Sequence, residues 1–120
     1  MESILTSIKK LLGIVPECKD FDVDIIMHIN SVFTILTQIG VGPSEGFSIS
    51  DENAEWSDFI SDAKNIEAVK SYTHLKVRLI FDPPTSSAVL ESMKTLIGEL
   101  EWRINVAAET EESEVQIQNE

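Results

Sequence analysis

The side chains that could do chemistry are few. Two histidines, His28 and His74, and one cysteine, Cys18, are present among 120 residues. A histidine that binds a metal needs further ligands, often at i+3 or i+4 on one helix face. At i+4, Val32 follows His28 and Arg78 follows His74, and neither residue is a metal ligand. The spacing therefore predicts no metal site.

A run of carboxylates, Asp51–Glu55 followed by Asp58, could suggest calcium. It lacks the central glycine and the closing glutamate of a calcium-binding loop, so it is more typical of a solvated acidic turn. Cys18 lies in the polar linker 16–20 with no catalytic partner nearby, which indicates a reduced thiol. No phosphate-binding glycine loop and no pair of spaced cysteines occurs. We predict neither catalytic residues, nor a cofactor, nor an enzyme.

The net charge of −12 is the strongest bias in the composition. The chain has nine basic and 21 acidic residues. This argues against a nucleic-acid-binding surface, because such a surface needs basic residues to displace counterions from the phosphates. The last twelve residues hold five of the acids, and the rest of the chain keeps a charge of −7. No apolar run approaches the ~20 residues that cross a bilayer, and the N-terminus lacks the pattern of a signal peptide. We therefore expect the protein neither to bind DNA nor to associate with a membrane.

Hydrophobic spacing predicts four helices, over about Glu2–Leu12, Val23–Ile39, Asn65–Phe81 and from Thr85 or Ser86 to about Ala108. The second is the clearest, because its apolar residues recur at spacings of three and four: Ile25, Ile29, Val32, Leu36 and Ile39. Asp22 is placed to cap its start, and Gly40 to end it. The predicted fold is an all-α, small four-helix bundle-like domain.

Two segments fall outside these helices. A long Gly/Pro loop follows the second helix, and within it Phe47–Ser50 alternates like an extended strand, while Trp56–Ile60 predicts one helical turn that plugs the loop onto the core. The tail 109–120 is acidic and lacks aromatic residues, which predicts disorder in a lone subunit. We therefore divide the chain into a helical domain, 1–108, and a C-terminal tail, 109–120.

The helical stripes predict both a core and an outer face. The expected core comprises Ile25, Ile29, Leu36, Val69, Ile80, Leu96, Leu100 and Ile104. At 100° per residue, Trp102 points about 180° away from Met93. Its face is either an ordinary exposed singleton or a subunit interface, where Trp, Tyr and Arg are enriched. The candidate interface residues are Tyr72, Thr95, Gly98, Trp102 and Arg103.

Taken together, four segments resemble the small head–tail connector (adaptor) proteins of long-tailed bacteriophages. They are the helix and loop 21–46, the acidic-aromatic patch Ala54–Ile60, the helix with its proline stop Ala68–Pro84, and Glu99–Arg103. The resemblance covers most of the chain and includes size and helix order. It contains no chemical motif.

The resemblance implies a structural role in the virion neck, after assembly in the bacterial cytoplasm. Such proteins form a dodecameric ring that binds the portal on one side and the stopper or tail-completion protein on the other. DNA passes through the ring without tight binding. The unusually acidic tail departs from the family pattern. Its alternating residues, Glu114, Val115, Gln116, Ile117 and Gln118, are candidates for docking on the portal by β-strand addition. The other possibility is a solubilising tail.

A second hypothesis comes from charge alone. An acidic regulatory protein could mimic DNA or sequester a basic partner. The two hypotheses differ in oligomeric state, because a connector joins a ring, whereas a mimic is a monomer or dimer that competes with DNA.

Overall fold

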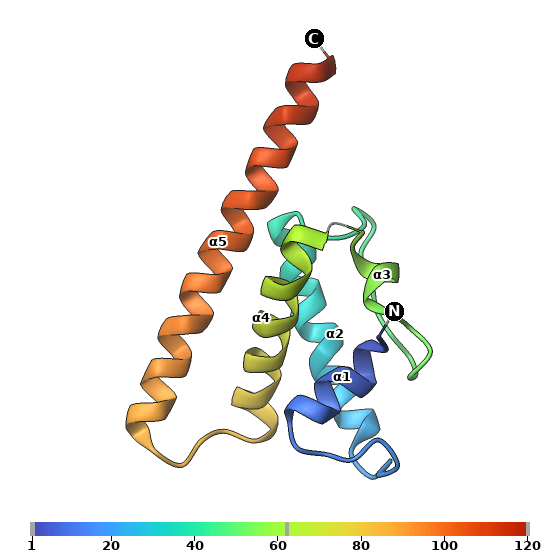
Figure 1. The fold of residues 1–120 in the computed structure, drawn as a ribbon, viewed down its shortest axis with the longest axis vertical. Helices are drawn as coiled ribbons and strands as arrows, with labels where there is room; N and C mark the ends of the chain where they lie inside the picture. Colours follow the sequence, from blue (N-terminus) through green and yellow to red (C-terminus); the bar gives the residue numbers. More distant parts are fainter. Residues whose placement is uncertain (1, 62, 120) are drawn as a thin grey trace.

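The computed structural model describes residues 2–61 and 63–119, with side chains for 2–61 and 65–109. Within these residues the helices are α1 (Ile4–Leu11), α2 (Asp22–Ile39), α3 (Trp56–Phe59), α4 (Ala63–Phe81) and α5 (Ser87–Asn119). The described residues include no strand, only an isolated bridge between Ser3 and Glu55. The all-α prediction is confirmed. In Figure 1, α4 lies between α5 on one side and α2 and α1 on the other.

The ends of α2 test the predicted caps. Gly40 ends the helix with φ +105°, a conformation that glycine adopts without steric cost, so this prediction is confirmed. The prediction for Asp22 is wrong. The N-cap is Phe21, without a side-chain cap bond, and Asp22 is the first helical residue. The Asp22 carboxylate pairs instead with Nζ of Lys9, 2.8 Å from Oδ1.

Lys9 is the most unusual residue of the core, because it is a lysine with 1% exposure. Its Nζ donates hydrogen bonds to the carbonyls of Pro16 (3.0 Å) and Cys18 (2.6 Å), besides pairing with Asp22. Two of the three N–H groups of the ammonium therefore have carbonyl acceptors, and the Asp22 carboxylate supplies the opposite charge. The side chain therefore fixes the α1–α2 loop against the start of α2.

Aromatic rings hold the long loop between α2 and α4 on the core. The Phe33 ring of α2 stacks on Phe59 at 4.3 Å between centroids, and Phe47 and Trp56 complete the cluster. The Trp56 indole N–H donates to Oγ of Ser7 in α1 at 2.8 Å. Trp56 and Phe59 are buried, which confirms that this turn plugs the loop onto the core.

The segment around Ile49 does not form a strand. The side chain of Asn30 on α2 replaces a partner strand. Its Nδ2 donates to the carbonyl of Ile49 (2.9 Å), and its Oδ1 accepts from the Ile49 N–H (2.8 Å). One side-chain amide therefore satisfies both backbone groups of a residue that is itself buried.

The last helix continues further than predicted, to Asn119 rather than about Ala108. The segment 109–119 holds neither glycine nor proline and is rich in Glu and Gln, which have good helix propensity. No sequence signal ends the helix at Ala108. No described helix is long and apolar enough to cross a membrane.

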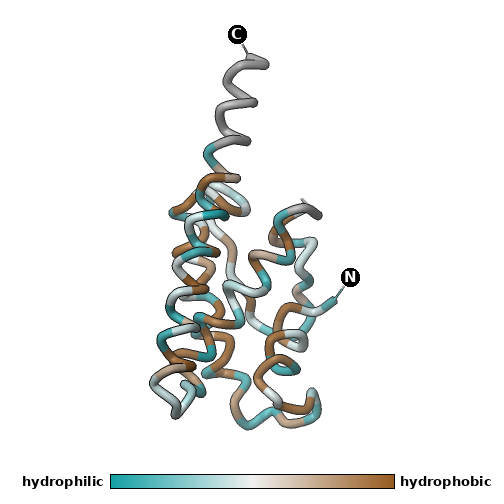
Figure 2. The backbone as a smooth tube through the Cα atoms, turned by 60° about the vertical axis from the view of Figure 1, so that its left-hand side comes forward, coloured by the Kyte–Doolittle hydropathy of each residue, from teal (hydrophilic) through white to brown (hydrophobic). Residues whose placement is uncertain are grey.

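The core prediction was right for most residues. Ile25, Ile29, Leu36, Val69 and Ile104 are buried, and Leu100 is partly buried against the core. Figure 2 shows hydrophobic and hydrophilic segments alternating along the helices, as amphipathic packing requires.

Two core predictions were wrong, since Ile80 is 59% and Leu96 45% exposed. Leu96 lies at the edge of the stripe made by Met93, Ile97 and Ile104, so it faces solvent beside α4. Ile80 shares the helical face of Val69 and Thr73, but it lies in the last turn of α4, where Phe81 rather than Ile80 makes the contact, with the Phe21 ring.

Candidate assembly surface

The outer face of α5 is an exposed surface opposite the core stripe. Met93, Ile97 and Ile104 are buried against the rest of the fold, whereas Trp102 is 66% and Val106 38% exposed. The geometry follows from 3.6 residues per turn, which places Trp102 on the side away from Met93. Thr95 is exposed on the same face, about two turns earlier.

Gly98 lies within this face and has no packing reason inside the subunit. A Cβ built on it would meet nothing within 4 Å, and its φ is not in the left-handed region. A glycine in a helix interior costs about 1 kcal/mol relative to alanine. The position therefore loses stability without an intramolecular gain, as expected where another backbone approaches closely.

Arg103 is exposed, but its guanidinium already has a partner. Its Nη2 lies 2.7 Å from Oε1 of Glu99, one turn earlier on α5. Exposed i, i+4 pairs of this kind contribute only about 0.3–0.5 kcal/mol, so the pair can exchange for an intermolecular one at little cost.

Tyr72 does not belong to this surface in the isolated chain. Its side chain is fully buried, and its hydroxyl donates to Oε2 of Glu101 at 2.9 Å. Burial, together with this bond, raises the pKa of Tyr72 far above its usual value. Tyr72 is therefore not exposed in the isolated chain, as a residue of a free interface would be. Tyr72 instead joins α4 to α5 and so positions the outer face.

Sequence reasoning missed other exposed apolar residues near the α4–α5 connection and along α5. These are Ile80, Val89, Leu96 and Val106. Single exposed apolar residues are common, so most of them carry no weight. Val106 differs, because it lies one turn after Trp102 on the same face of α5.

The candidate portal-docking residues 114–118 lie within the helical span of α5. Their side chains lie outside the described residues. Docking by strand addition would require this segment to leave the helical conformation. That docking stays a prediction.

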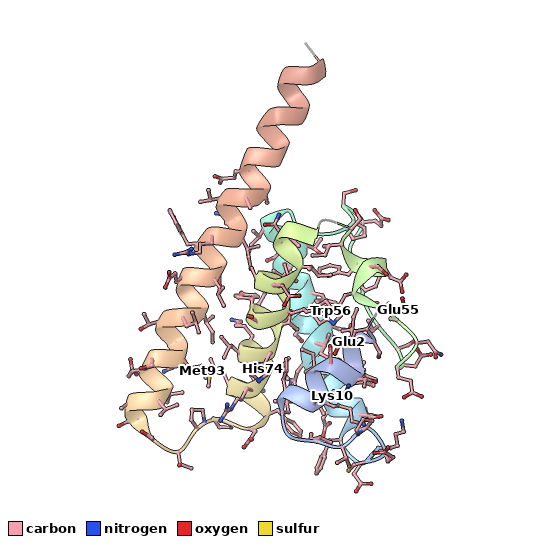
Figure 3. All side chains as sticks on the ribbon, in the orientation of Figure 1. Glu2, Lys10, Glu55, Trp56, His74 and Met93 are labelled. Atoms are coloured by element: carbon pink, nitrogen blue, oxygen red, sulfur yellow. The ribbon has the colours of Figure 1, made fainter. Side chains whose placement is uncertain are left out.

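A groove of about 350 Å³ separates α1 from α4 on the other side of the molecule. In Figure 3, Lys10 of α1 and His74 of α4 lie on its two sides. Lys70 lies 3.7 Å from carboxylate oxygens of both Glu2 and Glu67. The lining residues are Glu2, Ser7, Lys10, Leu11, Glu67, Lys70, Ser71 and His74.

His74 makes the groove sensitive to pH. Burial is the main cause that lowers the pKa of His74 below its ordinary 6.5, the Arg78 charge adds to it, and a hydrogen bond with the Leu11 backbone opposes it. Below pH 6.5 the His74 imidazole is therefore protonated in the unfolded chain, whereas folding disfavours its protonation. The free energy of unfolding should fall as the pH drops through and below 6.5.

Urea denaturation at several pH values measures this dependence. We expect His74→Gln to flatten the profile just below pH 6.5. An equal slope in wild type and His74→Gln would contradict the assignment to His74.

Catalytic chemistry has little support in the described side chains. They contain no group of three or more His, Cys, Asp or Glu placed to hold a metal. Within the acidic turn, Oδ1 of Asp51 accepts from the N–H of Asn53, and Oδ2 of Asp58 accepts from the N–H of Glu55 as part of the α3 capping box. These carboxylates have local structural roles.

Comparison with known proteins gives one match. A family model described as "Phage connector protein" matches residues 4–111. No curated protein and no solved structure shows significant similarity. The match covers all the helices that build the core and most of α5.

Proposed function

The chain belongs to the phage connector protein family, and from this premise we propose that it joins the portal to the stopper or tail-completion protein in the virion neck. In this proposal it assembles as a ring, with twelve copies as the family resemblance implies, around the channel through which DNA passes. The family is a structural one, and a head–tail connector role follows from membership.

The observation that best supports assembly is the outer face of α5. An indole that is 66% exposed lies one turn from a glycine that has no neighbour within 4 Å. Protein interfaces favour aromatic anchors and close backbone approach. The candidate interface therefore comprises Thr95, Gly98, Trp102 and Arg103, with Val106 added and Tyr72 in a supporting position.

The tail is the proposed portal contact. Residues 114–118 would add as a strand to an exposed sheet edge of the portal, with backbone hydrogen bonds giving affinity. Val115 and Ile117 would fill alternate pockets.

The test of the proposal is cryo-electron microscopy of the protein mixed with the portal protein of the same phage. A ring of this chain beneath the portal is the expected result. If the protein stays monomeric in the presence of an intact portal and does not join it, the connector role is wrong for this chain.

The DNA-mimic hypothesis keeps one supporting observation, the net charge of −12. The same charge suits a channel that repels phosphates. A connector should neither bind duplex DNA at physiological salt nor compete with DNA for a basic protein. Displacement of DNA from such a protein by the monomer, without ring formation, would favour the mimic.

Trp102→Ala should separate assembly from folding. Trp102 contacts solvent rather than the core, so helicity and the free energy of unfolding should change by less than about 0.5 kcal/mol. Self-association should weaken by at least about tenfold if the indole is an interface anchor. Circular dichroism and sedimentation velocity on one sample measure both.

A matched control is Val23→Ala, since Val23 is an exposed apolar residue, at 81%, on a different helix. Unchanged association of Trp102→Ala would make Trp102 an exposed singleton without an assembly role.

A further inference from the structure

The groove between α1 and α4 differs in charge from the rest of the molecule. Lys10, Lys70 and His74 line it, and the Arg78 charge acts on His74. Glu2 and Glu67 also line it, and both pair with Lys70, so its remaining positive charge comes from Lys10 and Arg78, in a chain whose net charge is −12. On α4, residues 70, 74 and 78 follow one another at i, i+4, which places them on one face. Among the described residues, Lys10 and Arg78 make no ion pair, unlike Lys9, Lys19, Lys70 and Arg103.

Apolar surface continues this basic groove. Leu11, which lines it, is 52% exposed, and Val15 in the following loop is 61% exposed. We call this combination the α1–α4 patch; its residues are Lys10, Leu11, Val15, Lys70, His74 and Arg78. Such a patch suits a partner that presents carboxylates around an exposed apolar or aromatic side chain.

The outer face of α5 has that composition. Trp102 and Val106 are exposed there together with Glu91 and Glu109, while Glu99 is exposed but paired with Arg103. Indole rings also attract lysine and arginine side chains through cation–π contacts. Copies of a −12 chain repel one another over most of their surface, so association requires a local site of opposite charge.

The two surfaces lie on different sides of the fold. Figure 1 shows α5 flanking α4 on one side and α1 on the other. In this arrangement the outer face of α5 cannot contact the α1–α4 patch of the same copy. It can contact the α1–α4 patch of the next copy. Contact between two different surfaces is heterologous, and it gives a ring when the repeated rotation closes.

We propose that the outer face of α5 of one copy docks into the α1–α4 patch of the next copy, with Trp102 against Leu11 and Lys10. This inference rests on the proposed ring and specifies its seam. It assigns the occupant of the groove to a second copy of this chain, rather than to the portal or the stopper.

The experiment uses two full-length variants, each with one surface blocked. Lys10→Glu reverses the charge of the patch, and Trp102→Asp removes the anchor from α5. Each variant alone should associate at least tenfold more weakly than wild type in sedimentation velocity. An equimolar mixture should form one-to-one dimers and no rings, because one intact surface of each kind remains. Lys19→Glu, with the same charge change outside both surfaces, should assemble like wild type.

Three results would overturn the seam. In the first, Lys10→Glu assembles like wild type. In the second, the mixture of the two variants stays monomeric. In the third, Lys10→Glu forms normal rings that no longer attach to the portal, which would make the groove a portal-binding site. In each case wild-type rings on the portal would leave the connector role intact. If wild type forms no ring even with the portal, the connector role and the seam fail together.

Discussion

Lys9→Met is expected to destabilise the folded chain by roughly 3–5 kcal/mol, the cost of leaving one member of a buried ion pair unpaired. The Lys9 and Asp22 side chains are 2% and 18% exposed, with 2.8 Å between Nζ and Oδ1. Methionine keeps the length and helix propensity of lysine but donates no hydrogen bond. The carbonyls of Pro16 and Cys18 would lose their donor as well.

Urea denaturation followed by circular dichroism measures this cost. The matched control is Lys10→Met, which makes the same change at the next position of α1, where the side chain is exposed. It should shift stability by less than about 0.5 kcal/mol. Lys9→Met/Asp22→Leu should recover part of the loss, since no lone charge remains. A Lys9→Met protein as stable as Lys10→Met would show that the pair contributes nothing.

The contrast between Lys9 and Lys10 shows a limit of sequence reasoning. The two residues are identical and adjacent, so composition and local pattern give no basis for burying one of them. What distinguishes them is the loop 16–22, which folds back so that two carbonyls and one carboxylate converge on Nζ of Lys9. Asn30 is similar, because its role depends on Ile49, nineteen residues away.

Local signals predicted the helices well. α2 ends at Gly40 because a left-handed residue follows Ile39, and α4 ends at Phe81 before the prolines that cannot continue it. The acidic turn before α3 and the aromatic plug were also visible, since their spacing is short. The end of α5 was not visible, because the segment after Ala108 has no helix-breaking residue.

Burial was harder to predict than helicity. Periodicity identifies the apolar face of a helix, but the packing of neighbouring elements determines which residues at the edge of that face are buried. Leu96 lies at the edge of the α5 stripe and is exposed, while Tyr72 was expected at a surface and is buried through its contact with α5. An exposed tryptophan opposite the stripe could be predicted, whereas the basic groove could not, because it combines residues of α1 and α4.

Deleting residues 109–120 is expected to abolish attachment to the portal while the ring-forming surfaces stay intact. The truncated chain keeps Ile104 in the core and Ala108, whose Cβ lies 3.6 Å from a Cβ built on Gly40. Its thermal unfolding should therefore match wild type within about 0.5 kcal/mol. Electron microscopy of portal mixed with each protein, together with pull-down on immobilised portal, measures attachment. Full attachment by the truncated chain would exclude the tail as the portal contact.

Two further variants, Val115→Ser and Ile117→Ser, test how the tail docks while preserving its charge. In a helix, residues 115 and 117 are about 200° apart, so they cannot both face one partner surface. In a strand they lie on the same side. Each substitution removes a branched apolar side chain whose full burial contributes about 1.5–3 kcal/mol. Strand addition therefore predicts that both variants weaken portal binding at least tenfold. Loss in one variant alone would indicate that the tail docks as a helix, and loss in neither would leave its charge as the contact.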